Sequence, residues 1–138
     1  MKKYSLTEKI KVFWRQIELL SRDLKYRSQT FKLAKKTKYG FRFYGNKHVT
    51  EGIFEVHETA LYIDLLPFVE SVINIGANVG YYCCLAIKNK KRVVAFEPDP
   101  LNVKYLASNI LANGWNDQIE IYPLALGSGC GITNFYGA

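Results

Sequence analysis

The fold is decided by the stretch VINIGANVG, residues 72–80. Its first four residues are apolar and β-branched except for Asn74, which is the pattern of a short buried strand. Residues 79–89 are compatible with a helix, so the two glycines lie where a strand turns into a helix. Gly76 and Gly80 have no side chain, and the backbone can therefore turn tightly and approach a ligand closely. Open α/β sheets bind their ligands at turns of this kind, beyond the carboxyl ends of the strands.

The spacing of the two glycines narrows the class of ligand. It is G-x-x-x-G, which is neither the G-x-G-x-x-G of dinucleotide-binding loops nor a P-loop, because no Gly-Lys-Ser or Gly-Lys-Thr follows. This counts against a nicotinamide cofactor and against ATP. We also expect the loop to point free N–H groups at its ligand, as the first turn of a helix does. Similar loops also serve as plain tight turns, so the loop alone identifies no ligand.

A carboxylate follows the next strand of the pattern. Residues 92–96 form the strand-like run RVVAF, and Glu97 comes directly after it. An acidic residue about 20 residues past a glycine loop can accept hydrogen bonds from both ribose hydroxyls of an adenosine. Asp99 has a different interpretation: with Pro100 behind it, Asp99 fits the N-cap of the next helix.

The remaining pattern alternates between helix and strand. Residues 58–66 favour a helix that stops at Pro67, residues 101–110 favour a helix that ends at an Asn-Gly pair, and residues 119–122 favour a third strand. Apolar strands that alternate with helices indicate a parallel sheet covered on both faces. The sequence therefore predicts an α/β fold.

Several of these segments, in this order, resemble the FkbM-type S-adenosylmethionine-dependent methyltransferases. The resemblance runs from about Gly52 to Phe135 and rests on residues 52–55, 72–82, 93–100 and 121–127, with Asn109 and Asn113 between them. It implies a Rossmann-like class I methyltransferase fold with S-adenosylmethionine as the cofactor. The acceptor that it implies is a hydroxyl group of a sugar or of another small metabolite.

The resemblance also implies a cofactor site. Glu97 would hold the ribose hydroxyls, Leu124 and Ala125 would lie near the adenine, and Glu55 would reach the site from the flanking segment. The methionine and ribose side of the cofactor would be lined by Asn74, Gly76, Ala77, Asn78 and Gly80. The family usually has Asp at the position of Asn74. Since an amide supplies no negative charge near the cationic methionine end, we expect weaker cofactor binding here but not a lost site.

The reacting centre is not identified by the sequence. Tyr81, His57 and Glu55 are available as a general base, and the choice among them stays open. The family continues to a further strand whose acidic residues help to shape the reacting centre, and nothing before Ala138 matches that strand. We therefore expect a fragment of the fold, truncated after its first three parallel strands, with an open strand edge that is prone to pair with other chains.

Residues 1–50 are expected to form a basic helical extension of a partial Rossmann domain at residues 51–138. The first segment holds 14 Lys and Arg against 3 acidic residues, whereas the second holds 5 against 9. Ser5 and Glu8 have the spacing of a capping box, and an apolar stripe at helical spacing follows them. Residues 35–40 have the pattern of a helix end and a turn. The stripe could cover the body of the domain, a second copy or a membrane surface, while the charges could simply form a solvated face.

Two other functions fit parts of the sequence. The alternative is a non-catalytic S-adenosylmethionine-binding or interaction module that docks on a protein or a membrane through the basic helix. A nucleic-acid methyltransferase would use the basic residues, but this function ranks below the other two because no Asn-Pro-Pro-aromatic segment is present.

No metal site is expected, because His48, His57 and the three cysteines lack ligand spacing. We interpret the three cysteines as reduced thiols. The sequence has no apolar run of roughly 20 residues and no signal-peptide pattern. Together these features predict a cytoplasmic protein.

Overall fold

The computed structural model of the chain describes residues 5–30 and 34–134. The chain divides into two compact units, residues 1–32 and residues 33–138. Phe135, where the family resemblance ends, lies outside the described residues, as does the terminal Ala138.

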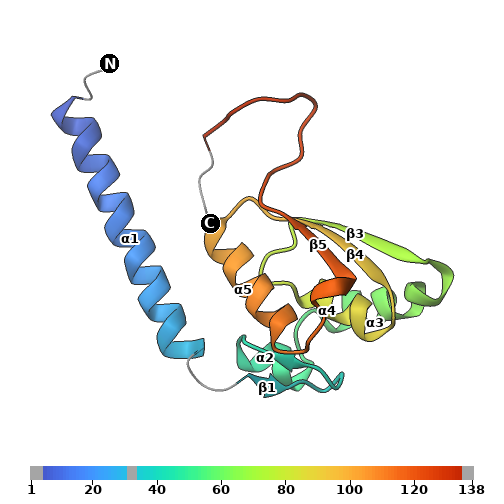
Figure 1. The fold of residues 1–138 in the computed structure, drawn as a ribbon. Helices are drawn as coiled ribbons and strands as arrows, with labels where there is room; N and C mark the ends of the chain where they lie inside the picture. The colour runs from blue at the N-terminus through green and yellow to red at the C-terminus, as the bar shows by residue number, and fades with distance from the viewer. Residues whose placement is uncertain (1–4, 31–33, 135–138) are drawn as a thin grey trace. The chain divides into compact units, whose positions relative to one another are not determined.

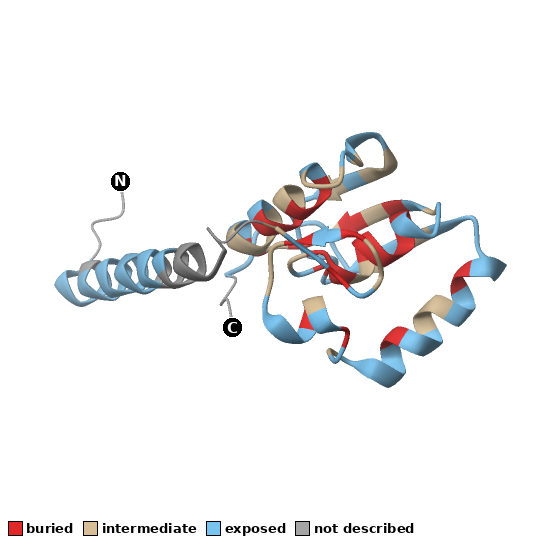
Figure 2. Ribbon diagram, turned by 90° about the horizontal axis from the view of Figure 1, so that it is seen from below, coloured by how far each residue is buried: buried red, intermediate tan, exposed pale blue. Residues whose placement is uncertain are grey.

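The first unit consists of one long helix, α1 (Leu6–Thr30). Its start confirms the capping box, because the N–H of Ser5 donates to Glu8 Oε2 at 2.7 Å and the N–H of Glu8 donates to Ser5 Oγ at 3.3 Å. The apolar stripe of α1 is exposed, as the pale blue in Figure 2 shows. Its members are Leu6, Ile10, Phe13, Trp14, Ile17, Leu20 and Leu24. Within residues 5–30 and 34–134, no helix combines the length and the apolar character that crossing a bilayer requires.

The second unit begins with an antiparallel hairpin of β1 (Lys35–Lys36) and β2 (Arg42–Phe43). The predicted helix end at residues 35–40 is therefore wrong, because the backbone there pairs with a neighbouring strand. The reason is tertiary: Phe41 and Phe43 are only 2% and 1% exposed and anchor the hairpin in the core.

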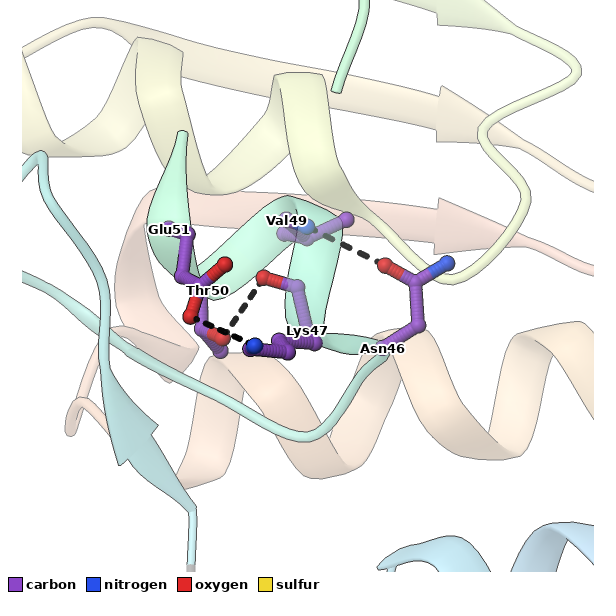
Figure 3. A network of polar contacts seen from close by, with 5 residues as sticks. All are labelled: Asn46, Lys47, Val49, Thr50 and Glu51. Atoms are coloured by element: carbon purple, nitrogen blue, oxygen red, sulfur yellow. Dashed lines mark hydrogen bonds and ion pairs between the residues drawn. The ribbon is translucent and has the colours of Figure 1, made fainter. Parts of the chain in front are cut away.

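A short helix that the sequence did not reveal follows the hairpin, α2 (Lys47–Glu51). Figure 3 shows the local polar contacts that hold it: Asn46 Oδ1 accepts the N–H of Val49 at 3.1 Å, and Lys47 Nζ pairs with Glu51 at 3.4 Å. One and a half turns are too short for a periodic apolar pattern. The hairpin and α2 both begin before residue 51, where the sequence placed the start of the domain, and the compact unit begins at Leu33.

The expected alternation of helix and strand makes up the rest of the unit. Its elements are α3 (Val56–Leu65), the 3-10 turn η1 (Leu66–Phe68), β3 (Ser71–Ile75), α4 (Tyr81–Lys88), β4 (Arg92–Phe96), α5 (Pro100–Leu111), the 3-10 turn η2 (Asn116–Gln118) and β5 (Ile119–Tyr122). The strands β3, β4 and β5 form a parallel sheet in that order. The segments that follow the three strands therefore leave from the same end of the sheet (Figure 1). This α/β arrangement is consistent with part of a Rossmann-like fold.

The helices cover one face of this sheet. On the covered face, Val93 and Ala95 of β4 are 2% and 0% exposed. On the other face, Ile73 and Ile75 of β3 are 66% and 64% exposed. Successive side chains of a strand point to opposite faces, so within the described residues the prediction of a sheet covered on both faces is wrong. The prediction failed because β3 has apolar residues on both of its faces, which is the sequence pattern of a fully buried strand.

The helix α4 lies at the centre of the core. Its residues 83–87 are all buried, because the sheet, α3, α5 and the aromatic side chains of the hairpin surround it. Tyr81, the first residue of α4, contacts the rings of Phe43 and Phe54 at centroid distances of 6.2 and 5.4 Å. This packing fixes the point at which the chain leaves the glycine loop.

Candidate functional site

The glycine loop, residues 76–80, joins β3 to α4 at the carboxyl end of the sheet. Its backbone has positive φ angles of 75° at Gly76, 50° at Asn78 and 88° at Gly80. A Cβ at Gly76 would meet nothing within 4 Å, whereas a Cβ at Gly80 would lie 2.3 Å from Leu106 Cδ1 of α5. The two glycines therefore serve different purposes. Gly76 borders open space that a ligand can fill, and Gly80 lets α4 and α5 approach each other.

The N–H groups of this loop are all used within the protein. Those of Gly76 and Ala77 donate to the carbonyl oxygen of Phe96 at 2.8 and 3.0 Å. The next three N–H groups along the loop donate in turn to the Glu97 carboxylate, to the Asn78 side chain and to the Ala77 carbonyl oxygen. The prediction that the loop points free N–H groups at its ligand is therefore wrong. A phosphate-binding loop needs such donors, so the structure agrees with the missing dinucleotide and P-loop motifs.

Glu97 ties the glycine loop to the end of β4, and its side chain is only 5% exposed. Its Oε2 accepts the N–H of Asn78 at 2.7 Å, and its Oε1 accepts the N–H of Asp99 at 2.9 Å and the side-chain amide of Asn102 at 3.3 Å. A carboxylate has about four lone-pair positions. Three of them are occupied here, and the one that is left, on Oε2, can accept one hydroxyl group while all these bonds are kept.

Asp99 caps the helix that follows, as the sequence predicts. Its Oδ1 accepts the N–H groups of Leu101 and Asn102 at 2.8 and 3.3 Å, and Pro100 occupies the first turn of α5. A side chain that satisfies two N–H groups of a helix start has a sufficient structural role. Asp99 thus acts as a cap that also offers its own N–H to Glu97.

The side chain of Asn74 points toward α4. Its amide donates to Cys83 Sγ at 3.2 Å. Burial raises the pKa of the Cys83 thiol to about 11, and the hydrogen bond from Asn74 opposes this rise. The thiol is therefore protonated at neutral pH. Asn74 helps to hold β3 against α4, directly before the chain enters the glycine loop.

Glu55 reaches the first turn of α4. Its backbone lies in the left-handed region, with φ 43° and ψ 57°, directly before α3, a conformation that residues other than glycine rarely adopt. Its exposed carboxylate accepts the hydroxyl of Tyr82 at 2.5 Å. Burial, followed by this hydrogen bond, raises the pKa of Tyr82 well above its ordinary value, so Tyr82 stays a donor. The pair stands two residues beyond Gly80, where the glycine loop ends.

Leu124 and Ala125 follow β5 at the same end of the sheet, and both are exposed. The N–H of Leu124 donates to the carbonyl oxygen of Tyr122 at 2.9 Å, and that oxygen also accepts the N–H of Glu97 at 3.1 Å. The rings of Tyr122 and Phe96 stack at a centroid distance of 5.2 Å. The turn after β5 is thereby held beside the end of β4.

A groove of about 360 Å³ lies beside the outer edge of β3. It is lined by Glu58, Leu61, Tyr62, Leu65, Val72, Ile73, Asn74 and Tyr82, from α3, β3 and α4. The groove is mostly apolar, and Tyr82 connects it to Glu55. It therefore extends from the edge of the sheet toward the glycine loop.

Sequence reasoning assigned no role in the site to Asn109 and Asn113, which hold the loop and the hairpin in place. Asn109 is fully buried; its Oδ1 accepts the N–H of Tyr44 at 2.6 Å, and its Nδ2 donates to the carbonyl oxygens of Val79 at 2.8 Å and of Tyr44 at 3.4 Å. Asn113, one turn further along, makes the same pair of bonds to the backbone of Arg42 at 2.8 and 2.7 Å. The two amides thus take the place of a partner strand. Asn109 lies on the buried face of α5 and Asn113 in the turn directly after α5, and two Asn residues four positions apart at a helix end are the pattern that could have indicated this.

Comparison with models of protein families shows that residues 74–138 match the family model of the methyltransferase FkbM domain. The resemblance seen in the sequence is confirmed over these residues. A search of curated proteins finds no match. Among solved structures, the chain is similar to a crystal structure of a "putative transferase" from Pyrococcus horikoshii, with 23% identity, a TM-score of 0.48 and 67% of this chain covered. The chain spans 35% of that protein.

Proposed function

We propose that the chain is the S-adenosylmethionine-binding part of a methyltransferase, because residues 74–138 match the family model of the methyltransferase FkbM domain. The acceptor that we propose, on the family resemblance, is a hydroxyl group of a sugar or of another small metabolite. The observation that carries the cofactor assignment is the bond between Glu97 and the glycine loop. It places a buried carboxylate with one free lone-pair position beside the open space at Gly76.

The site suits an adenosine that carries no phosphate. A dinucleotide or ATP would need free N–H donors in the loop, and the loop uses all five of its own N–H groups internally. S-adenosylmethionine has a methionine in place of the phosphates, so it makes no such demand. In this arrangement Glu97 would accept a ribose hydroxyl, and Leu124 and Ala125 would provide the apolar edge for the adenine.

Among the candidate general bases Tyr81, His57 and Glu55, we propose Glu55 for a hydroxyl acceptor, because its carboxylate contacts Tyr82 in the first turn of α4. Tyr81 is excluded, because burial raises its pKa to about 12 and it shares a hydrogen bond of 3.2 Å with Thr59 inside the core. Glu55 is an exposed carboxylate held at the start of α4 by Tyr82. When bound, the cofactor supplies an electrophilic methyl group. Glu55 would take the proton that the acceptor hydroxyl loses as its oxygen is methylated.

Calorimetric titration with S-adenosylhomocysteine tests the cofactor site through matched variants. Glu97→Gln replaces an oxygen acceptor by an NH₂ group, and we expect affinity to fall roughly 10-fold or more, as for other charged hydrogen bonds. Glu70→Gln makes the same change at an exposed carboxylate before β3 and should leave affinity unchanged. Circular dichroism of each variant confirms that it is folded. Equal affinities for the two variants would contradict the assignment of Glu97.

A further inference from the structure

The helix α1 carries an apolar stripe that nothing in its own unit covers. Phe13, Trp14 and Leu20 are 58%, 64% and 62% exposed. The members of the stripe recur at spacings of three and four residues from Leu6 to Leu24 of the helix, which places them on roughly a third of its circumference. Exposed apolar surface of this extent in a soluble chain indicates a contact partner.

The charge of this segment selects among partners. Residues 1–32 hold nine Lys and Arg against three acidic residues. Two copies of so basic a helix repel each other, which disfavours a second copy as the partner. A nucleic acid would attract the cations but would leave the apolar stripe in water. A bilayer of anionic lipids accommodates both, because the headgroups attract the cations and the acyl boundary takes up the apolar side chains.

The aromatic residues and the length of α1 favour the same partner. Phe13 and Trp14 both belong to the stripe, and such rings are favoured at the boundary between headgroups and acyl chains. A helix of 25 residues is about 37 Å long at 1.5 Å per residue. Since α1 is not apolar enough to cross a membrane, it would lie in the plane of the surface.

The second unit has a cationic surface of its own. Lys88 Nζ at the end of α4 lies 3.6 Å from where a Cβ of Gly40 would stand, so the turn of the hairpin and the end of α4 are neighbours. The exposed cations on these two segments are Lys35, Lys36, Lys38, Arg42, Lys88, Lys90 and Arg92. Within the described parts of the chain, none of them is paired with a carboxylate. These cations would add to the attraction toward anionic headgroups.

From these observations we propose that the chain binds the surface of anionic lipid membranes through α1, with the apolar stripe inserted at the acyl boundary. The proposal is independent of the methyltransferase assignment, because it uses no residue of the cofactor site.

Vesicle sedimentation with the full chain tests this proposal. We expect binding to phosphatidylglycerol-rich vesicles that is roughly 10-fold or more tighter than binding to phosphatidylcholine vesicles, and weaker at high salt. Ile17→Glu places a charge on the stripe and should reduce binding roughly 10-fold or more. The matched control, Gln16→Glu, adds the same charge off the stripe and should bind within about threefold of wild type. The fluorescence of Trp14 should shift to the blue on binding, and a Trp14→Phe variant assigns the shift.

Four results would overturn the proposal. One is wild-type protein that is folded but does not sediment with anionic vesicles. Another is equal loss of binding in Ile17→Glu and Gln16→Glu, which would mean that only net charge matters. The third is a dimer that Ile17→Glu dissociates while vesicles bind neither form, which would make the stripe an interface between copies. Binding of duplex DNA that Ile17→Glu leaves unchanged, without vesicle binding, would contradict it as well.

Discussion

Gly80 and Gly76 show at the scale of single residues how a short motif combines packing with ligand access. Both have positive φ, but only Gly80 faces a neighbour, Leu106, at a distance that no Cβ tolerates. We expect Gly76→Ala to lower the free energy of unfolding by about 1–2 kcal/mol, the cost of the left-handed backbone alone. Gly80→Ala should cost about 3 kcal/mol or more, because the fully buried side chain of Leu106 must also be displaced. Urea denaturation of both variants measures this, and equal losses would contradict the different roles.

Some residue roles follow from local chemistry and others do not. Asp99 followed by Pro100 is a helix start whatever surrounds it, so its cap could be predicted. Glu97 could be placed at a strand end, but the sequence shows neither its bond to Asn78 nor its contact with Asn102. Those bonds depend on how the loop folds back over β4. They leave one lone-pair position of the Glu97 carboxylate for a ligand, whereas the sequence predicted that Glu97 accepts both ribose hydroxyls.

At the scale of elements, Asn109 connects three parts of the second unit. It joins α5 to the hairpin at Tyr44 and to the glycine loop at Val79. Asn109→Ala removes three hydrogen bonds that a fully buried amide makes to the backbone of Tyr44 and Val79, so we expect a loss of about 2–4 kcal/mol in the free energy of unfolding. Asn116→Ala, at an exposed position, should change it by less than about 0.5 kcal/mol. If chemical denaturation shows similar midpoints for both variants, the hydrogen bonds of Asn109 do not contribute to the free energy of unfolding.

The strand β3 has an open edge and an uncovered apolar face. Ile73 is 66% exposed, and the groove beside it is mostly apolar. Surfaces of this kind pair with other chains. Ile73→Lys should therefore lower self-association, measured by light scattering over a range of concentrations. Leu111→Lys makes an equivalent change at a side chain that is 63% exposed on α5; an equal effect of both would show that added charge, not the strand edge, is responsible.

The elements themselves differ in how well the sequence predicts them. β4, β5 and α5 have strong local patterns, and the structure confirms them at their predicted positions. The hairpin was missed because its stability comes from distant groups: Arg42 and Tyr44 bond to side chains 71 and 65 residues away. The helix α2 was missed because it is too short for a periodic apolar pattern. No local pattern shows such contacts.

At the scale of the whole molecule, the chain is a helix unit followed by an α/β unit. Alternation of helix and strand was enough to predict the second unit. The coverage of its sheet was not predictable, because it depends on what packs on the face that carries Ile73 and Ile75. The basic character concentrated in the first 50 residues and a helical extension before the domain were both visible in the sequence, whereas the start of the second unit at Leu33 was not.

The central claim is that the glycine loop and Glu97 form a site for an adenosine without phosphate. The most direct test is calorimetric titration of the folded wild-type chain with S-adenosylhomocysteine, with NAD and ATP titrated under the same conditions. The account predicts saturable binding of S-adenosylhomocysteine and no measurable binding of NAD or ATP, because the loop has no free N–H group for a phosphate. Binding of NAD or ATP as tight as that of S-adenosylhomocysteine would contradict it, and so would a folded chain that binds none of the three.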